Sequence, residues 1–410
     1  MTSTVDLAHR LGPRLVALRR TLHRHPEVGL HLPVTQAAVL DALAGLGLEV
    51  TTGEALSSVV AVLRGTAPVE GHRPVVLLRG DMDALPVTEE VEADHASAVP
   101  GVMHACGHDL HVAALVGAAH VLHELRDELA GDVVLMFQPG EEGPGGAEPM
   151  LREGLLDVAG RRVDAAYAVH VTAAERPFGV WFSRPGPLMA SADEVRVTVR
   201  GAGGHGSAPH HALDPVPVAC EVVLALQSAV TRRFDVFDPV VVTAGRIAAG
   251  TVNNVIPDDA VVELTVRALS ARHRAEALAV VRQVAEGVSG AHGLTADVVV
   301  DHGYPVTRND ESEYSFAREV VVDLFGGQRW TEMPNPEMGS EDMSFVMDEV
   351  PGAYLFVSAC AGPDPTAVPD NHSPRAVFDD AVVPDVAAAL AELALRRCRI
   401  PAAGGPGSLD

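Results

Sequence analysis

Short apolar runs that alternate with helical patterns constrain the fold of this 410-residue chain more than any other feature. Runs at 59–63, 74–79, 132–138 and 165–171 predict strands, and a helical pattern at 109–125 lies between the second and third of them. Such alternation is typical of an α/β domain with a mostly parallel sheet flanked by helices. Because ligands gather where loops leave the carboxyl ends of such strands, we expect a functional site there.

The pattern changes after the Pro-Gly-Pro sequence at 185–187. An alternating strand begins at Asp193, and with the elements that follow it forms two strand–helix–strand halves within about 115 residues, which indicates a separate α/β sandwich of ferredoxin-like type. Residues 355–359 are expected in a loop. The predicted division is a first domain at 1–187 and 303–400, an inserted domain at 188–302 and a disordered Pro/Gly-rich tail at 401–410.

The charge balance excludes several functions. The chain has 55 acidic and 30 basic residues, a net charge of −25, and every basic residue is Arg. Without Lys there is no Schiff-base chemistry, pyridoxal anchor or P-loop lysine. The negative charge also argues against nucleic acid or an anionic membrane surface as a partner.

The location is predicted from cysteine usage and from apolar runs. Four scattered cysteines without a C-x-x-C pair are typical of a reducing compartment. No apolar stretch reaches the length of a membrane span, and the first 20 residues show no apolar signal-peptide core. We therefore expect a cytoplasmic protein with no membrane partner.

Side chains that commonly bind metals follow the predicted strands. They are Asp81, Asp83, Cys106, His108, Glu141, Glu142, His170 and His372. Taken singly, each could cap a helix or lie in a solvated turn. Together they predict a metal centre, and the Cys-x-His pair suits Zn²⁺, Mn²⁺ or Co²⁺ better than Ca²⁺ or Mg²⁺. In the glutamate pair, one carboxylate would bind metal while its neighbour acts as a base.

A series of ordered motifs is spread over residues 22–383. They include Gly-Asp-Met-Asp-Ala-Leu-Pro at 80–86, His-Ala-Cys-Gly-His-Asp at 104–109, Asn-Val-Ile-Pro-Asp at 254–258 and Asn-His-Ser-Pro at 371–374. With these motifs the chain resembles the hippurate hydrolase, N-acyl-amino-acid amidohydrolase and indole-acetyl-amino-acid hydrolase family. That family belongs to the aminoacylase–carboxypeptidase G superfamily of dinuclear metallopeptidases.

The resemblance implies a site with two divalent metal ions, Mn²⁺, Zn²⁺ or Co²⁺. The implied metal ligands are Cys106, His108, Glu142, His170 and His372. Cys106 would bridge the two metals, and Glu141 would be the general base. Asp81 and Asp83 are interpreted as groups that orient the ligands, because no position is left for them at the metals.

The resemblance also assigns roles to residues of the inserted domain. His205 would polarise the scissile carbonyl, whereas Asn254 and Arg267 would hold the substrate carboxylate. The planar fork of Arg suits that task because it meets a carboxylate with two hydrogen bonds. Since the superfamily commonly dimerises through this domain, we expect a homodimer in which His205 acts across the interface.

These observations favour a metal-dependent amidohydrolase that cleaves an N-acyl amino acid, such as an acetyl, benzoyl or aryl-acyl conjugate, into a carboxylate and a free amino acid. A metallo-aminopeptidase or dipeptidase on the same scaffold is an alternative. A thiol hydrolase with Cys106 as nucleophile is another. A non-enzymatic amino-acid-binding or metal-storage protein is the least favoured, because it has no use for Glu141 beside a ligand.

Overall fold

The computed structural model describes residues 3–400, which separate into two compact units. The first unit comprises the chain up to Gly186, Arg308–Pro334 and the chain from Phe345 onward. The second comprises Pro187–Thr307 and Asn335–Ser344. The predicted tail at 401–410 lies outside the described residues.

The observed units differ from the predicted division by a few residues at 187 and 303–307, and in one longer segment. Residues 335–344 belong to the second unit, whereas the sequence analysis assigns them to the first domain. Backbone contacts explain this, because the amide of Ala190 donates to the carbonyls of Glu337 (3.1 Å) and Gly339 (2.8 Å). The segment is therefore attached to the start of the second unit.

The first unit is built on an eight-stranded mixed sheet. In spatial order its strands are β1 (Glu49–Thr52), β2 (Val59–Arg64), β4 (Asp132–Gln138), β3 (Val75–Asp81), β5 (Ala165–Thr172), β16 (Gly352–Ser358), β6 (Trp181–Ser183) and β15 (Trp330–Glu332). The four central strands β4, β3, β5 and β16 are parallel. Helices cover this sheet, so the predicted mostly parallel α/β sheet is confirmed.

Strand β16 corrects the expectation of a loop at 355–359. All seven of its residues are buried, and it pairs with β5 on one side and β6 on the other. A strand that is buried on both faces has no polar–apolar alternation, so its sequence lacks the pattern that marks a half-exposed strand.

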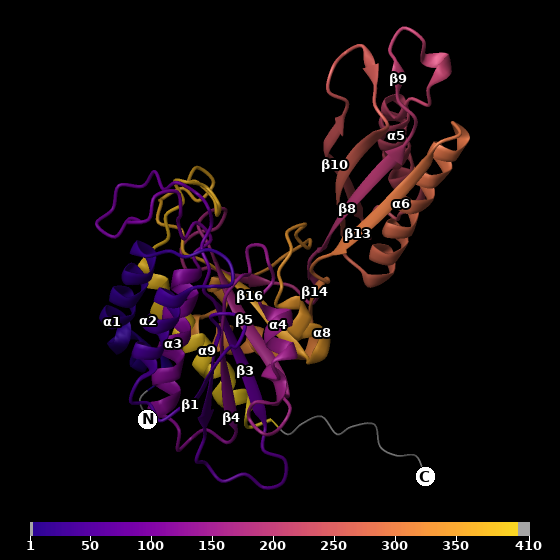
Figure 1. Cartoon of the computed structure of the whole chain (residues 1–410). Helices are drawn as coiled ribbons and strands as arrows, with labels where there is room; N and C mark the ends of the chain where they lie inside the picture. Colours follow the sequence, from indigo (N-terminus) through magenta and orange to yellow (C-terminus); the bar gives the residue numbers. More distant parts are fainter. Residues whose placement is uncertain (1–2, 401–410) are drawn as a thin grey trace, which may run out of the picture. The chain divides into compact units, whose positions relative to one another are not determined.

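The helices of the first unit are α1 (Thr4–Arg24), α2 (Pro33–Leu43), α3 (His108–Glu124), α4 (Ala147–Arg152), α7 (Glu311–Phe325), α8 (Ser344–Glu349) and α9 (Val383–Arg397). Helices α3 and α9 pack against the sheet and against each other, and α1 packs against both (Figure 1). Because α3 lies between the sheet and α1, it is buried on nearly every side. Its first turn, which begins at His108, is therefore buried as well.

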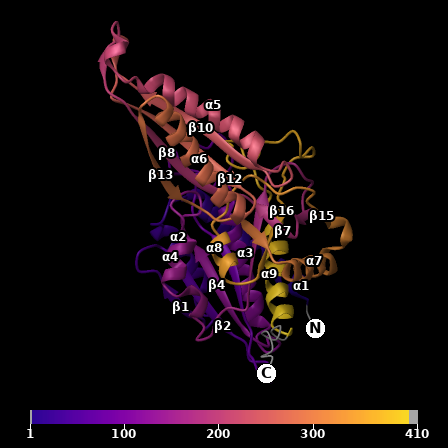
Figure 2. The ribbon, with the colours of Figure 1, turned by 90° about the vertical axis from the view of Figure 1, so that its right-hand side faces the viewer.

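The second unit contains a four-stranded antiparallel sheet in the order β10 (Val240–Ala249), β12 (Asp259–Ala268), β8 (Ser191–Arg200) and β13 (Thr295–His302). Helices α5 (Pro215–Arg233) and α6 (Ala271–Ala291) pack together on one face (Figure 2). The element order strand–helix–strand–strand–helix–strand and the strand order are those of a ferredoxin-like sandwich.

Two small strand pairs complete the fold. Strands β9 (Gly204–His205) and β11 (Val255–Ile256) form a short ribbon, and β7 (Gly186–Met189) pairs with β14 (Thr307–Asn309) where the chain passes between the units. Within the described part of the chain, none of the helices has the length and apolar character that a bilayer crossing demands.

Candidate metal centre

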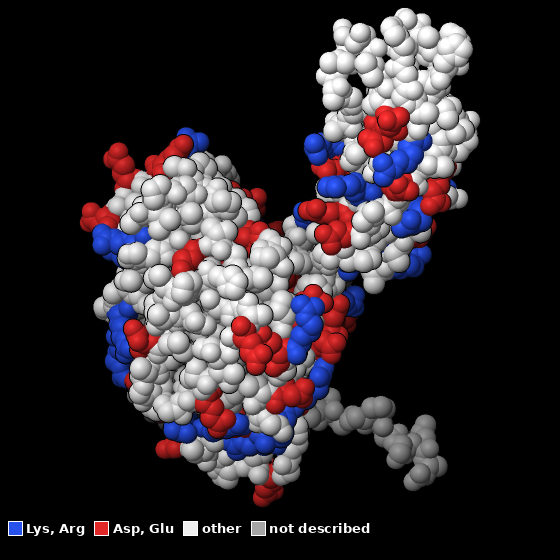
Figure 3. Space-filling view, viewed as in Figure 1, with Lys and Arg blue, Asp and Glu red and all other residues white. Residues whose placement is uncertain are grey.

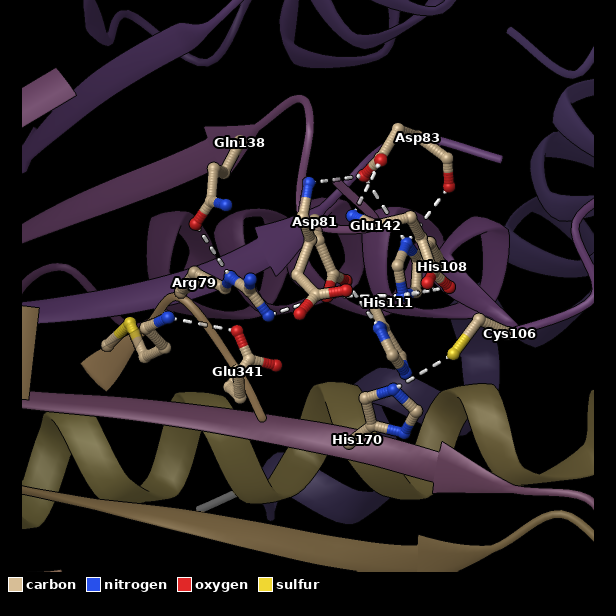
Figure 4. A network of polar contacts seen from close by, with 12 residues as sticks. Arg79, Asp81, Asp83, Cys106, His108, His111, Gln138, Glu142, His170 and Glu341 are labelled. Carbon is tan, nitrogen blue, oxygen red and sulfur yellow. Dashed lines mark hydrogen bonds and ion pairs between the residues drawn. The ribbon is translucent and has the colours of Figure 1, made fainter. Parts of the chain in front are cut away.

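The five predicted ligands come together at the carboxyl ends of β3, β4 and β5. Figure 4 shows Cys106, His108, Glu142 and His170 there. Cys106 and His108 stand at the start of α3, Glu142 follows β4, His170 lies near the end of β5, and His372 precedes α9. The Cys106 Sγ lies 3.4 Å from His170 Nε2, and the Glu142 Oε1 lies 3.2 Å from His372 Nε2. The fold thus gathers residues that are up to 266 positions apart in sequence, from 106 to 372.

The ligand atoms form two overlapping clusters. One contains Cys106, His108 and His170, and the other contains Cys106, Glu142 and His372; within each cluster the ligand atoms lie within 4.8 Å of one another. Cys106 belongs to both clusters. A thiolate in this position can contact two cations at once, which is the arrangement expected of a bridging ligand.

Two of the imidazoles have one nitrogen held by a backbone carbonyl and the other directed at the clusters. His108 Nδ1 donates to the carbonyl of Asp83 (2.9 Å), and His170 Nδ1 donates to the carbonyl of Val171 (2.7 Å). With Nδ1 as the donor, the neutral form of each ring carries its lone pair on Nε2, and the buried Nε2 of His108 makes no hydrogen bond. Metal-binding histidines are oriented in this way. Burial opposes protonation of His108, but the nearby Asp81 outweighs it and raises the pKa of this ring, so a metal ion bound there displaces a proton.

The pKa shifts of Cys106, Glu142 and His170 agree with a bound cation, whereas the hydrogen bond to Glu142 raises the pKa of His372, a ring that must lose its proton to bind metal. Burial raises the pKa of the Cys106 thiol to about 12, so this thiol stays protonated unless a cation stabilises the thiolate. Burial opposes ionisation of Glu142, but the hydrogen bond from His372 and the proximity of His108 outweigh it and lower the pKa of this carboxyl. Burial lowers the pKa of His170, which keeps it neutral and able to bind metal. One thiol, one carboxylate and three imidazoles fit a borderline-soft divalent ion.

Asp83 holds the loop that carries both glutamates. Its Oδ1 accepts from the amide of Glu141 and its Oδ2 from the amide of Glu142, both at 3.0 Å. Its carbonyl accepts from His108, as described above. One aspartate therefore connects a ligand-bearing loop to a ligand-bearing helix, as expected of a residue that orients ligands.

The carboxylate of Asp81 accepts hydrogen bonds from a guanidinium group and from an imidazole ring. Its Oδ2 lies 2.5 Å from Arg79 Nη1, and its Oδ1 lies 2.5 Å from His111 Nδ1. His111 Nε2 in turn accepts from the amide of Val171 (2.9 Å), the residue after His170. Both carboxylate oxygens are thus engaged, and His111 connects Asp81 to the end of β5.

Glu141 lies beside the clusters. It is 8% exposed, and one of its carboxylate oxygens lies within 4.8 Å of ligand atoms of His108 and Glu142. A carboxylate at this distance is available to exchange a proton with a molecule bound at the centre.

A buried ionic cluster attaches the first turn of α3 to α1. Asp109, next to His108, lies 2.8 Å from both Arg19 Nε and His23 Nδ1. Burial opposes ionisation of Asp109, yet these two cationic neighbours lower the pKa of the carboxyl. Asp109 is therefore a buried tether of the ligand-bearing turn and not a surface helix cap.

Of the predicted substrate-binding residues, His205 and Asn254 lie side by side in the second unit. His205 pairs with Val255 in the ribbon, and the amide of Gly206 donates to the carbonyl of Asn254 (2.8 Å). His205 Nδ1 accepts from the amide of Ser207 (3.1 Å), so its Nε2 carries the proton and is free to donate. Figure 3 shows no charged side chain on the visible face of the end that carries this ribbon.

Arg267 does not join them within one copy of this unit. It lies near the far end of β12, eight residues beyond Asp259, and its Nη1 donates to the carbonyl of Met338 (2.8 Å). The ribbon adjoins the other end of β12, because the amide of Gly203 donates to Asp258 Oδ1 (2.8 Å). At the rise of a β-strand the two ends are about 27 Å apart, so one small carboxylate cannot reach both.

Two residues near the ligands were not predicted from the sequence. His111 lies three positions after His108 on the same face of α3, and Asn371 immediately precedes His372. Their partners are mainly backbone groups of distant segments, which no sequence pattern reveals. The helical spacing of His111 from His108 was the one available signal.

Known proteins with similar sequences and structures are hydrolases. The model of "Peptidase family M20/M25/M40" matches residues 77–396. Thermostable carboxypeptidase 2 of Saccharolobus solfataricus is 35% identical, over 93% of this chain and 95% of that protein. IAA-amino acid hydrolase ILR1-like 4 of Arabidopsis thaliana is 37% identical, over 93% of this chain and 85% of that protein. The crystal structure of the YXEP protein of Bacillus subtilis, described as a dinuclear metal binding peptidase, superposes with a TM-score of 0.81 at 29% identity, covering 95% of this chain and 99% of that one.

Proposed function

Because this chain belongs to peptidase family M20/M25/M40 and is therefore a hydrolase of amide or peptide bonds, we propose that it cleaves N-acyl amino acids with the help of two divalent metal ions. The observation that carries this proposal is the pair of ligand clusters that share Cys106, with Glu141 beside them. The relative that hydrolyses IAA-amino acids supports the substrate class.

The residues divide the reaction among them. Cys106, His108, Glu142, His170 and His372 hold the ions, and bound divalent ions supply Lewis-acid activation of water and of the amide carbonyl. Glu141 takes a proton from the attacking water on its carboxylate and passes it to the nitrogen of the leaving amine. The acyl group leaves as a carboxylate, and the amino acid is released.

The second unit supplies the groups that recognise the substrate. His205 donates from Nε2 to the oxygen of the carbonyl as negative charge develops on it. Asn254 and Arg267 bind the carboxylate of the amino acid, with Arg267 giving up its contact to Met338 for a charged partner. Because His205 and Asn254 lie about 27 Å from Arg267 along β12, a complete site needs the ribbon of one copy and the arginine of another. We therefore propose a homodimer formed through this unit.

The location in the cell is also a proposal. All four cysteines are free. Free thiols, one of them a metal ligand, persist in a reducing compartment, and this supports the cytoplasm.

A substrate panel tests the function. N-acetyl, N-benzoyl and N-indoleacetyl amino acids should be hydrolysed to free amino acids when Mn²⁺, Zn²⁺ or Co²⁺ is supplied. Unblocked dipeptides form the second arm, because a relative named as a carboxypeptidase favours peptide substrates. If the protein released amino acids from the dipeptides but not from the N-acyl amino acids, it would be a dipeptidase and the proposed amidohydrolase activity would be wrong.

The two adjacent glutamates should behave differently when each is changed to Gln. Glu141→Gln should keep both metal ions but lower kcat by at least ~10², because a general base contributes about that much. Glu142→Gln should instead lose metal, since it removes an anionic ligand. Metal content by elemental analysis and steady-state kinetics separate the two results, and the reverse pattern would exchange the two roles.

A further inference from the structure

The side chain of Asn371 contacts two of the ligand-bearing segments and stands next to the third. Its amide nitrogen donates to the carbonyls of Cys106 (3.2 Å) and Val171 (3.1 Å), and its amide oxygen accepts from the amide of Ala173 (2.8 Å). Cys106 lies two residues before α3, whereas Val171 and Ala173 flank the last residue of β5. Both amide hydrogens and the amide oxygen are thus used to join the two segments.

The next residue attaches the third segment. The amide of His372 donates to the carbonyl of Ala105 (2.8 Å), so the loop before α9 is bonded to the residues on either side of the Ala105–Cys106 peptide. His372 has φ = 67°, a left-handed conformation that a residue other than glycine rarely adopts. The bonds made by Asn371 and His372 hold this unfavourable backbone and aim the His372 ring at Glu142.

Asn371 also acts on the ligand atoms themselves. The carbonyl of Val171 accepts from both Asn371 and His170 Nδ1, so the position of this carbonyl determines which nitrogen of His170 faces the cluster. The amide nitrogen of Asn371 lies 3.8 Å from Cys106 Sγ, so one of its two N–H groups, shared with a carbonyl, is within the range of a weak N–H···S contact. Such a contact withdraws electron density from a thiolate.

We propose that Asn371 is the positioning residue that sets the geometry of Cys106, His170 and His372 and tunes the Cys106 thiolate. It touches neither substrate nor metal and acts only through these three ligands. The inference rests on the proposed metal centre, so its test measures metal binding and the spectrum of the bound metal as well as activity.

The test compares Asn371→Ala with Ser373→Ala, a control on the same loop. Within residues 3–400, Ser373 Oγ accepts its one side-chain hydrogen bond from the nearby amide of Arg375 (3.2 Å), so its loss perturbs the loop without breaking a link to a ligand segment. Co²⁺ affinity is measured by competition with a chromophoric chelator. Asn371→Ala should bind Co²⁺ roughly 10- to 100-fold more weakly, as expected when a group that orients ligands is lost. Ser373→Ala should bind it as the unchanged protein does.

The spectrum gives a second readout. With the N–H group near sulfur removed, the thiolate-to-cobalt charge-transfer band should move to longer wavelength in Asn371→Ala. Wild-type affinity and an unmoved band in this variant, or an equal loss of affinity in Ser373→Ala, would overturn the inference. If Asn371→Ala fails to fold, Asn371→Ser, which keeps one donor, must show a smaller change in the same direction, and wild-type behaviour there overturns it too.

Co²⁺ binding by the unchanged protein separates an error in the role of Asn371 from an error in the proposed metal centre. An unchanged protein that binds no Co²⁺ at all would remove the metal centre and the inference with it. An unchanged protein that binds Co²⁺ while Asn371→Ala binds it equally well removes the inference alone.

Discussion

Removal of divalent metal should abolish hydrolysis of N-acyl amino acids, and addition of Mn²⁺, Zn²⁺ or Co²⁺ should restore it. The reason is that a cation acidifies bound water, and Glu141 alone is too weak a base to activate water without it. Activity is measured after dialysis against a chelator and again after titration with each metal. A metal-free protein as active as the loaded one would end the metal hypothesis.

Substitution of the predicted metal ligands tests whether the loss of activity on metal removal arises at this site. Cys106→Ala and His372→Ala should lower the bound metal as well as the activity, because each removes a donor from the clusters. Cys220→Ala is the matched control, since this thiol is exposed on α5. The same set tests the thiol-hydrolase alternative, in which Cys106→Ala would lose activity while its metal content stays unchanged.

His205→Ala should lower kcat by ~10² to 10³, because it removes a donor to the developing oxyanion. The same variant should regain activity when it is mixed with Glu141→Gln under conditions that let subunits exchange. One site of each heterodimer then has an intact Glu141 from one copy and an intact His205 from the other. With random exchange of equal amounts, about a quarter of the wild-type activity should return.

The separation of Arg267 from the ribbon extends this test to two more residues. Arg267→Ala should complement His205→Ala, because the two side chains reach one substrate only from different copies. Asn254→Ala should fail to complement His205→Ala, because both belong to the same ribbon. Absence of recovery despite confirmed subunit exchange would mean that His205 serves its own subunit or has no catalytic role.

Much of the local structure could be predicted from periodicity. Strand β4 at Asp132–Gln138 has the expected bounds, and helix α3 at His108–Glu124 lies within one residue of the expected 109–125, since apolar spacing and flanking turn residues are local properties of the chain. Strand β16 could not be predicted in this way. Its partners β5 and β6 lie far from it in sequence, and all of its residues are buried, so it shows no alternation of polar and apolar residues. The predicted metal ligands relied on ordered motifs and on the rule that strand ends meet at one edge of a sheet.

By itself, then, the sequence determined the α/β class, the position of several strands and helices and the donor types of the candidate metal centre, because these depend on residue type and short-range spacing. Only the tertiary structure decided that Cys106 is shared by two clusters, that Arg267 lies at the opposite end of β12 from His205, and that Asn371 joins the ligand-bearing segments. The physical reason is that these relations are made by packing and by hydrogen bonds to backbone groups. Every residue carries the same backbone groups, so their pairing appears only when the chain is folded.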